Sequence, residues 1–272
     1  MRHAANGCCP GLLPIFGPSG VAAPADPVGS AGPAPKSAGP VDRALLLDLA
    51  AAARILAAEG VVDAFGHVSM RHPKAPDRYL MSRSCAPALQ TADDIIEYDL
   101  DSTPIDANGR GSFLERYIHG QIYRSRPDVT SVVHSHSPSV IPYGLTGLPM
   151  RAMYHNAAFL AAGVPVFRVE EKFGATNMLV SDNKMGQELA RVIGDKSVAL
   201  MRAHGSVACG PSLQIAVFRA VYTEVSARVQ QAALAHGLSI AALSAEEGRL
   251  ADETNLMACM RAWDLWRSQV KF

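Results

Sequence analysis

The chain has 272 residues, of which 49% are hydrophobic, and its 25 basic residues balance 25 acidic ones. The length allows one large domain or two small ones, and the neutral balance excludes the strongly basic surface of proteins that bind nucleic acid or anionic membranes. No run approaches the roughly 18 apolar residues of a transmembrane helix, and five scattered cysteines do not form a disulfide framework. We therefore expect a cytoplasmic protein.

Residues 1–40 differ in composition from the rest of the chain, with eight prolines and seven glycines. Such a segment cannot bury enough apolar surface to offset the entropy of ordering it. It also lacks the uninterrupted apolar core of a secretory signal. We predict a disordered Pro/Gly/Ala-rich tail, or the product of an upstream start codon, followed by one catalytic domain over residues 41–272.

The remaining chain alternates between helical and strand-like patterns. The first predicted helix begins at Asp42, a typical N-cap residue, and stops at Gly60. Further strands are predicted at 66–72, 78–84, 95–100, 129–137, 164–169, 197–203 and 205–210, and further helices at 112–126, 183–194, 212–237 and 261–270. Because no repeat is visible, this interleaving predicts a single α/β domain with helices layered on one sheet.

Two histidines lie inside the apolar run "VVHSHSPSV", at His134 and His136. In a strand, residues two apart point to the same face, about 6–7 Å from each other, so both imidazoles can bind one metal ion. The same pattern also fits one hydrogen-bonded core histidine and one loop histidine. Two further residues are compatible with a metal site: His204, beside Gly205 in a predicted turn, and Glu115, on the helix before the strand. Taken alone, a His-Gly turn is usually structural and a helix glutamate is usually solvated.

Taken together, the segments "ERYIHGQIYRSRPDVTSVVHSHSP" and "ALMRAHGSVACG" resemble the two metal segments of the class II aldolase/adducin superfamily, over about residues 42–270. The resemblance implies an α/β domain with a central, mostly antiparallel sheet flanked by helices. It implies one divalent metal ion per subunit, with His134, His136 and His204 as ligands. It also implies that Glu115 is an acid/base residue that binds the metal when substrate is absent. A homotetramer with sites at subunit interfaces is implied as well.

Three departures from the sugar-phosphate aldolases of this superfamily concern their phosphate site. His67 replaces Asn in "GHVS", Arg83 follows Ser82 in "SRS", and Phe113-Leu114 replaces a pair of serines. Loss of two hydroxyls leaves a phosphate dianion poorly solvated, whereas an arginine can hold a carboxylate in bidentate fashion. We therefore expect His67, Ser82 and Arg83 to bind a carboxylated substrate.

Other residues leave their roles open. Arg71 and Arg151 are either additional carboxylate partners or ordinary surface arginines. Phe65, Met81, Phe113 and Leu114 either flank a flat ring or belong to the core. His155 lies near the position where the aldolases carry a catalytic tyrosine from a neighbouring subunit, and either donates a proton to the reaction intermediate or forms an interface hydrogen bond. His72, His119 and His236 are expected to be surface or structural histidines.

The segments "DAFGHVSMRHP", "YLMSRSCAP", "ERYIHGQIY" and "MYHNAAFL" look most like the metal-dependent aromatic decarboxylases of hydroxylated pyridine or phthalate dicarboxylates. We therefore expect a decarboxylase of a small hydroxylated aromatic, or ring-opened aromatic, carboxylate that uses Mn²⁺, Fe²⁺, Co²⁺ or Zn²⁺. One alternative is a mononuclear non-heme iron oxygenase that oxidatively decarboxylates a prenylated hydroxyphenylpyruvate. Another is a sugar-phosphate aldolase or dehydratase. The complete ligand set argues against the purely structural role that adducins have.

Overall fold

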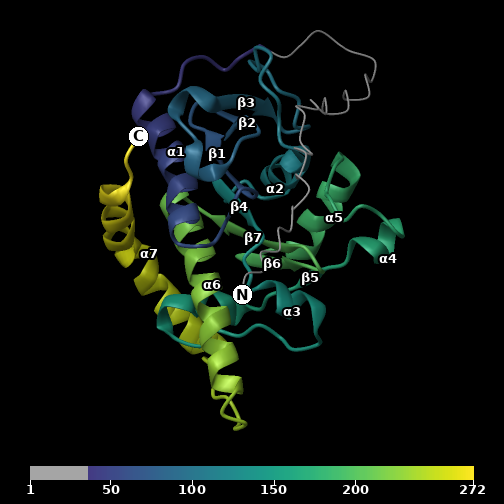
Figure 1. The fold of residues 1–272 in the computed structure, drawn as a ribbon, viewed down its shortest axis with the longest axis vertical. Coiled ribbons are helices and arrows are strands. Elements are labelled where there is room, and N and C mark those ends of the chain that lie inside the picture. The colour runs from purple at the N-terminus through teal and green to yellow at the C-terminus, as the bar shows by residue number, and fades with distance from the viewer. Residues whose placement is uncertain (1–35) are drawn as a thin grey trace, which may run out of the picture. The chain divides into compact units, whose positions relative to one another are not determined.

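Seven strands form one sheet in the computed structural model, which describes residues 36–272 (Figure 1). The strands are β1 (His67–His72), β2 (Ala75–Ser82), β3 (Ile95–Asp99), β4 (Ser131–Ser135), β5 (Val166–Phe167), β6 (Val198–Met201) and β7 (Gly205–Gly210). They lie in the order β3-β2-β1-β4-β7-β6-β5, and each neighbouring pair is antiparallel except β5 and β6. The predicted fold class, an α/β domain with a mostly antiparallel central sheet, is confirmed.

Helices cover both faces of the sheet. The α-helices are α1 (Arg43–Ala58), α2 (Tyr117–Ser125), α3 (Ile141–Leu145), α4 (Val169–Phe173), α5 (Asn183–Ile193), α6 (Leu213–Leu234) and α7 (Ala245–Gln269). Short 3₁₀ helices are η1 (Pro87–Leu89), η2 (Ala92–Asp94), η3 (Leu114–Arg116) and η4 (His155–Ala162). One apolar cluster joins the sheet to α1, α6 and α7, and a second joins its other face to α2 and α5 (Figure 1).

The central strand β4 is buried on both faces. Val133 belongs to the apolar cluster under α1 and α6, whereas Val132 belongs to the cluster under α2 and α5. A strand covered on both sides is apolar throughout rather than alternating, which explains the run before the first histidine. Because side chains alternate along a strand, His134 shares the face of Val132 and points toward the α2 side of the sheet.

Two predicted helices differ from the observed ones. The helix predicted for 112–126 is divided into η3 and α2, because the backbone of Glu115 has φ −93° and ψ 20° and interrupts the helix there. The last helix begins at Ala245 rather than 261. Its start is fixed by a capping box, in which the Ser244 hydroxyl accepts from the Glu247 N–H and the Glu247 carboxylate accepts from the Ser244 N–H.

Most of the tail predicted for residues 1–40 lies outside the described residues, which begin at 36. Residues 36–40 have no regular secondary structure, but they contact the domain at Glu97. The Ser37 hydroxyl donates to one carboxylate oxygen at 2.6 Å and the Ala38 N–H to the other at 2.9 Å. Between residues 36 and 272, no helix has both the length and the apolar character needed to cross a membrane.

Candidate metal centre

Four side chains predicted as metal ligands come together at one end of the sheet. Glu115, His134, His136 and His204 each offer a ligand atom, and these atoms all lie within 4.8 Å of one another. The His136 Nε2 atom is 3.1 Å from the Nε2 of His134 and 3.0 Å from that of His204. The Glu115 Oε2 atom is 3.3 Å from the Nε2 of both His134 and His204.

The backbone around the ligands explains why a glycine follows His204. His134 lies in β4, His136 just beyond its end, and His204 in the turn that connects β6 to β7. A Cβ atom on Gly205 would lie 2.0 Å from the Ser135 carbonyl oxygen, far inside van der Waals contact. Only glycine therefore allows β7 to begin this close to β4, and this approach holds His204 beside His136.

Backbone carbonyls fix the orientation of two of the imidazoles. The Nδ1 atom of His134 lies 3.1 Å from the Ser206 carbonyl oxygen, and the Nδ1 atom of His204 lies 3.0 Å from that of Met178. A carbonyl oxygen only accepts hydrogen bonds, so both Nδ1 atoms carry the proton. The Nε2 atoms therefore keep their lone pairs toward the centre of the cluster, as metal-binding histidines do.

Glu115 is held in the ionised form. The Val180 N–H donates to its Oε1 atom at 2.9 Å, which leaves Oε2 facing the histidines. Burial raises the pKa of the Glu115 carboxyl, but His134 and His204 lower it more strongly, so it lies well below its usual range. Burial, together with His134 and His204, also lowers the pKa of His136 to about 4. The cluster thus offers a carboxylate and a neutral imidazole at neutral pH.

The donor set fits a divalent metal ion. Two imidazole lone pairs that face each other at 3.0–3.1 Å repel unless a proton or a cation lies between them. Two ligands that share an ion at a bond length of about 2.1 Å are themselves roughly 3.0–3.4 Å apart, which agrees with the four observed separations. Three imidazole nitrogens and one carboxylate oxygen suit iron, zinc, cobalt or manganese.

A cavity of about 350 Å³ opens beside the ligands. Its lining includes Glu115 and His136 from the cluster, together with apolar side chains: Phe65, Phe113, Leu114 and Leu179. Such a lining, apolar with a few polar groups at one end, is typical of a small-molecule site. Of the four apolar residues named from the sequence as ring contacts, Phe65, Phe113 and Leu114 line the cavity, whereas Met81 is buried in the core.

Residues 47–231 match the model of the family described as Class II Aldolase and Adducin N-terminal domain. The chain belongs to this family. The predicted resemblance is therefore confirmed, and the match covers the four candidate ligands and all strands of the described sheet.

Individual members of the class II aldolase/adducin family resemble the chain over most of its length. The decarboxylase tropJ of Talaromyces stipitatus is 36% identical over 240 residues, which cover 80% of this chain and 90% of that protein. The 3,4-dihydroxyphthalate decarboxylase of Terrabacter sp. is 32% identical over 220 residues, covering 76% and 87%. A solved structure, the aldolase II superfamily protein of Pseudomonas syringae, has the same fold, with a TM-score of 0.69 and 23% identity over 84% of this chain and 92% of that one. The chain is an enzyme of this family.

His67 also lines the cavity, next to the metal ligands. It is the register partner of His134 in the antiparallel pair β1–β4, and the two ring centroids are 5.1 Å apart. Its ring also lies 4.7 Å from that of Phe113. Burial lowers the pKa of His67 well below its usual value, and His119 and His134 lower it further. The side chain is therefore neutral in the folded protein.

The other residues predicted to act at the site do not line the described cavity. The Ser82 hydroxyl donates to the Arg83 carbonyl oxygen at 2.9 Å, and the Arg83 Nε–H donates to Asp94. Neither side chain is among those that line the described cavity. His155 begins η4 with an exposed side chain and does not line this cavity either. Their roles in binding or catalysis remain predictions.

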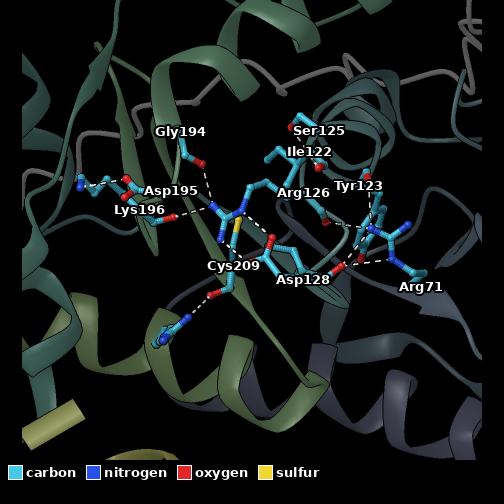
Figure 2. A network of polar contacts seen from close by, with 12 residues as sticks. Arg71, Ile122, Tyr123, Ser125, Arg126, Asp128, Gly194, Asp195, Lys196 and Cys209 are labelled. Carbon is cyan, nitrogen blue, oxygen red and sulfur yellow. Dashed lines mark hydrogen bonds and ion pairs between the residues drawn. The ribbon is translucent and has the colours of Figure 1, made fainter. Parts of the chain in front are cut away.

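Arg71, one of the two arginines whose role the sequence leaves open, has a structural function. Its guanidinium donates to the carbonyl oxygens of Tyr123, Arg126 and Val129, where α2 ends and the chain turns toward β4 (Figure 2). Figure 2 also shows Arg126, which pairs with Asp128 through two hydrogen bonds and donates to carbonyls of the loop before β6. Arg71 is therefore fully engaged away from the cavity, and Arg151 is exposed on the surface.

Sequence reasoning missed the segment that precedes α5. Met178 supplies the carbonyl that orients His204, Val180 supplies the N–H that orients Glu115, and Leu179 between them lines the cavity. Two of these three contributions come from the backbone, which is the same in every residue type. The sequence therefore contained no signal that marked this loop as part of the site.

Proposed function

We propose that the chain is a divalent-metal-dependent decarboxylase of a hydroxylated aromatic carboxylate. The observation that carries the proposal is the convergence of three imidazole Nε2 atoms and one carboxylate beside an apolar-walled cavity of about 350 Å³. Two relatives that match most of the chain are named as decarboxylases, and one of them as acting on 3,4-dihydroxyphthalate. The cavity offers apolar contacts for a ring, and its lining also includes Glu115 and His136 of the cluster.

His134, His136, His204 and Glu115 would hold the metal ion. A bound divalent ion supplies Lewis-acid chemistry, which stabilises the negative charge that develops as carbon dioxide leaves. Phe113 and Phe65 provide apolar surface for the ring, and the Val180 N–H keeps one Glu115 oxygen turned away from the substrate. A ring bound against these walls would displace water from the ligands, which would strengthen each electrostatic interaction there.

A proton must reach the ring carbon after carbon dioxide has left, and Glu115 is our first candidate for the donor. In the observed state its carboxylate is ionised and faces two imidazoles, an arrangement that supports a ligand role. To act as an acid, Glu115 must first leave the two imidazoles, contact the substrate and take up a proton. His155 is the second candidate, and because it is exposed on its own subunit, its participation requires a neighbouring subunit.

The replacement of the aldolases' serine pair disfavours a sugar phosphate. Phe113 and Leu114 line the cavity at the positions of the two hydroxyls that the aldolases would offer to a phosphate. A phosphate dianion against these side chains would lose hydrogen bonds that it makes in water, at a cost of about 2 kcal/mol or more per unpaired oxygen. An aromatic carboxylate has a ring that suits the same surface.

The deciding experiment is an anaerobic assay of the purified protein against hydroxylated benzene- and pyridine-dicarboxylates, beginning with 3,4-dihydroxyphthalate. Protein loaded with Mn²⁺ and protein loaded with Fe²⁺ are compared. Release of carbon dioxide without oxygen supports the proposal. Turnover only with Fe²⁺ and oxygen, on a 4-hydroxyphenylpyruvate derivative, would instead support the oxygenase. Cleavage of a sugar phosphate would support the aldolase.

We further propose that the protein is a homotetramer in the cytoplasm. The family resemblance and the exposed position of His155 support a site completed by a neighbouring subunit. Size-exclusion chromatography with light scattering tests the assembly. A monomeric protein with full decarboxylase activity would exclude any contribution of His155 from a neighbour.

A further inference from the structure

A chain of three buried hydrogen bonds leads from the cavity into the α2 side of the sheet. The Nδ1 atom of His67 lies 2.6 Å from the Nε2 of His119, whose Nδ1 lies 2.6 Å from the Ser69 hydroxyl. The Ser69 hydroxyl lies 2.7 Å from the hydroxyl of Tyr123. All four side chains are buried, and among them only His67 lines the cavity.

The available protons determine which atom donates in each of these three hydrogen bonds. Each of the three short contacts has one donor and one acceptor, and each imidazole carries at least one N–H. The hydroxyl of Tyr123 has Ser69 as its side-chain partner. If Tyr123 accepted from Ser69, its own proton would be buried without an acceptor, which costs the full desolvation of an O–H group. Tyr123 therefore donates to Ser69.

The remaining bonds follow from the first. Ser69 has one proton and two partners, Tyr123 and His119, so it donates to the Nδ1 atom of His119. The proton of His119 is then on Nε2 and is donated to the Nδ1 atom of His67. This leaves the single proton of His67 on Nε2. Since Nδ1 faces His119, Nε2 is the nitrogen that His67 offers to a molecule in the cavity.

We propose that His67 is a fixed Nε2–H donor to a carboxylate oxygen of the substrate, and that His119, Ser69 and Tyr123 are positioning residues that hold it in this tautomer. The inference rests on the proposed function, because a decarboxylase must bind a carboxylate in this cavity. Two arginines are placed elsewhere: Arg71 is engaged at the end of α2, and Arg83 does not line the cavity. Glu115 repels a carboxylate.

A neutral donor suits a carboxylate that must leave as carbon dioxide. A cationic donor would stabilise the ground-state carboxylate through a strong charge-assisted bond, and that stabilisation is lost as the charge moves into the ring. A neutral N–H orients the carboxylate through a weaker hydrogen bond, so less stabilisation is lost as the charge moves into the ring. His67 itself is not the source of the proton for the ring. If His67 gave up its Nε2 proton and regained one through these hydrogen bonds, Tyr123 would become a buried tyrosinate. Burial raises the pKa of Tyr123 far above its usual value, which disfavours that state.

The far end of the chain is anchored by a cation. The Arg71 guanidinium stacks over the ring of Tyr123 at 4.8 Å and donates to the Tyr123 carbonyl oxygen (Figure 2). Rotation of the Tyr123 side chain away from Ser69 would therefore break its stacking contact with Arg71. The same arginine that the sequence suggested as a substrate partner instead holds the last residue of the chain that orients His67.

The test compares two probes that differ by one carboxylate, catechol and 2,3-dihydroxybenzoate. Calorimetric titration of the Mn²⁺-loaded protein gives the affinity for each probe, with KM used where a probe is turned over. Loss of one hydrogen bond to a charged acceptor predicts that His67→Leu weakens binding of 2,3-dihydroxybenzoate by about tenfold or more and leaves that of catechol unchanged. His67→Gln, which keeps an N–H donor, should restore most of the preference. Tyr123→Phe should fall between the wild type and His67→Leu.

A matched control is His72→Leu, because His72 is an equally buried histidine at the other end of β1 and lies outside the chain. It should leave the preference for the carboxylated probe unchanged. Metal content by mass spectrometry is measured for every variant and should stay at the wild-type value. A neutron structure of the metal-free protein should show the deuteron of His67 on Nε2.

Two results would overturn the proposal. One is an equal loss of affinity for both probes in His67→Leu, which indicates a structural role only. The other is a deuteron on Nδ1 of His67. These failures differ from a failure of the proposed function: a wild-type protein that prefers the carboxylated probe through His67 but releases no carbon dioxide would overturn only the decarboxylase.

Discussion

His67 and His134 face each other across β1 and β4, as Cα partners in register with ring centroids 5.1 Å apart. The register therefore places the proposed substrate donor next to a proposed metal ligand. A slip of one residue would exchange His134 for Val133 or Ser135 and would turn the imidazole to the opposite face of the sheet. The pairing of β4 with both β1 and β7 prevents such a slip, so the sheet itself sets the geometry of the site.

The cluster predicts metal loss when one ligand is removed. His136→Ala should lower the affinity for Mn²⁺ or Zn²⁺ by more than the roughly 10- to 100-fold that loss of an outer-shell partner costs, since a direct ligand is removed. Decarboxylation should then fall below detection at limiting metal. Metal per chain after dialysis against a weak chelator is the measurement. His236→Ala removes an exposed histidine and should behave as the wild type. A metal-free His136→Ala protein with full activity would contradict the assignment.

The buried histidine chain predicts a steep dependence of stability on pH. Burial, with a smaller effect of His134, lowers the pKa of His119 to about 3. In the unfolded chain the same imidazole titrates near pH 6.5, so between about pH 6.5 and pH 3 the unfolded state binds one more proton than the folded state. The stabilisation is complete above pH 6.5 and is lost by about 1.4 kcal/mol for each pH unit as the pH falls through this range.

Urea unfolding of the metal-free protein between pH 7 and pH 4 measures this effect. The wild type should lose stability with falling pH more steeply than His119→Gln, which carries no titratable group at that position. The slopes are compared rather than the absolute stabilities, because the substitution also breaks hydrogen bonds to His67 and Ser69. His236→Gln serves as the control, with an unchanged slope. Equal slopes in wild type and His119→Gln would mean that His119 is protonated in the folded protein.

The pair His134 and His136 could be predicted as co-ligands from alternation along a strand, since their Nε2 atoms lie 3.1 Å apart. Their convergence with His204 and Glu115 could not be derived from spacing. It depends on which turn returns to the end of β4, and only the family resemblance supplied that information. The close approach of Gly205 to Ser135 shows the physical reason for the His-Gly pair, but it requires knowledge that β4 and β7 are neighbours.

The parts of the site that the sequence did not predict depend on the backbone. Glu115 lies in a 3₁₀ turn with non-helical angles rather than on a regular helix, and apolar periodicity cannot reveal one interrupted residue. The carbonyl of Met178 and the N–H of Val180 come from a loop without regular structure. His119 was expected to be a surface or structural histidine, and it is completely buried. Its partners, His67 and Ser69, belong to β1, and sequence spacing does not connect that strand to α2.

A methyl group at Gly205 should disrupt the metal centre. In Gly205→Ala the new Cβ would meet the Ser135 carbonyl oxygen at 2.0 Å, so β4 and β7 must separate at the point where His136 and His204 meet. We expect a loss of about 3 kcal/mol in the free energy of unfolding, together with reduced metal content. Thermal unfolding and metal analysis measure both. Gly147→Ala is the control, because a Cβ there meets no atom within 4 Å. Unchanged metal affinity in Gly205→Ala would contradict this explanation of the His-Gly pair.

Arg83 is the remaining candidate for a direct charge contact with the substrate. Its Nε–H is bound to Asp94, which is itself fixed by the N–H and hydroxyl of Thr91 at 2.8 and 2.9 Å. This pairing occupies one edge of the guanidinium and leaves the side chain 43% exposed, so the terminal nitrogens are accessible to a substrate carboxylate. A charge-assisted pair with such a carboxylate predicts that Arg83→Gln raises KM by about 10- to 100-fold.

Steady-state kinetics separate this effect from a loss of folding. KM should rise in Arg83→Gln while metal content and the thermal midpoint remain at wild-type values. Asp94→Asn should raise KM less, because it frees the guanidinium from its anchor without removing its charge. Arg43→Gln is a matched control, since Arg43 is exposed and forms one ion pair with Asp93, the neighbour of Asp94. An unchanged KM in Arg83→Gln would mean that Arg83 only anchors the end of β2. His67 would then be the principal hydrogen-bond donor to the substrate carboxylate in the cavity.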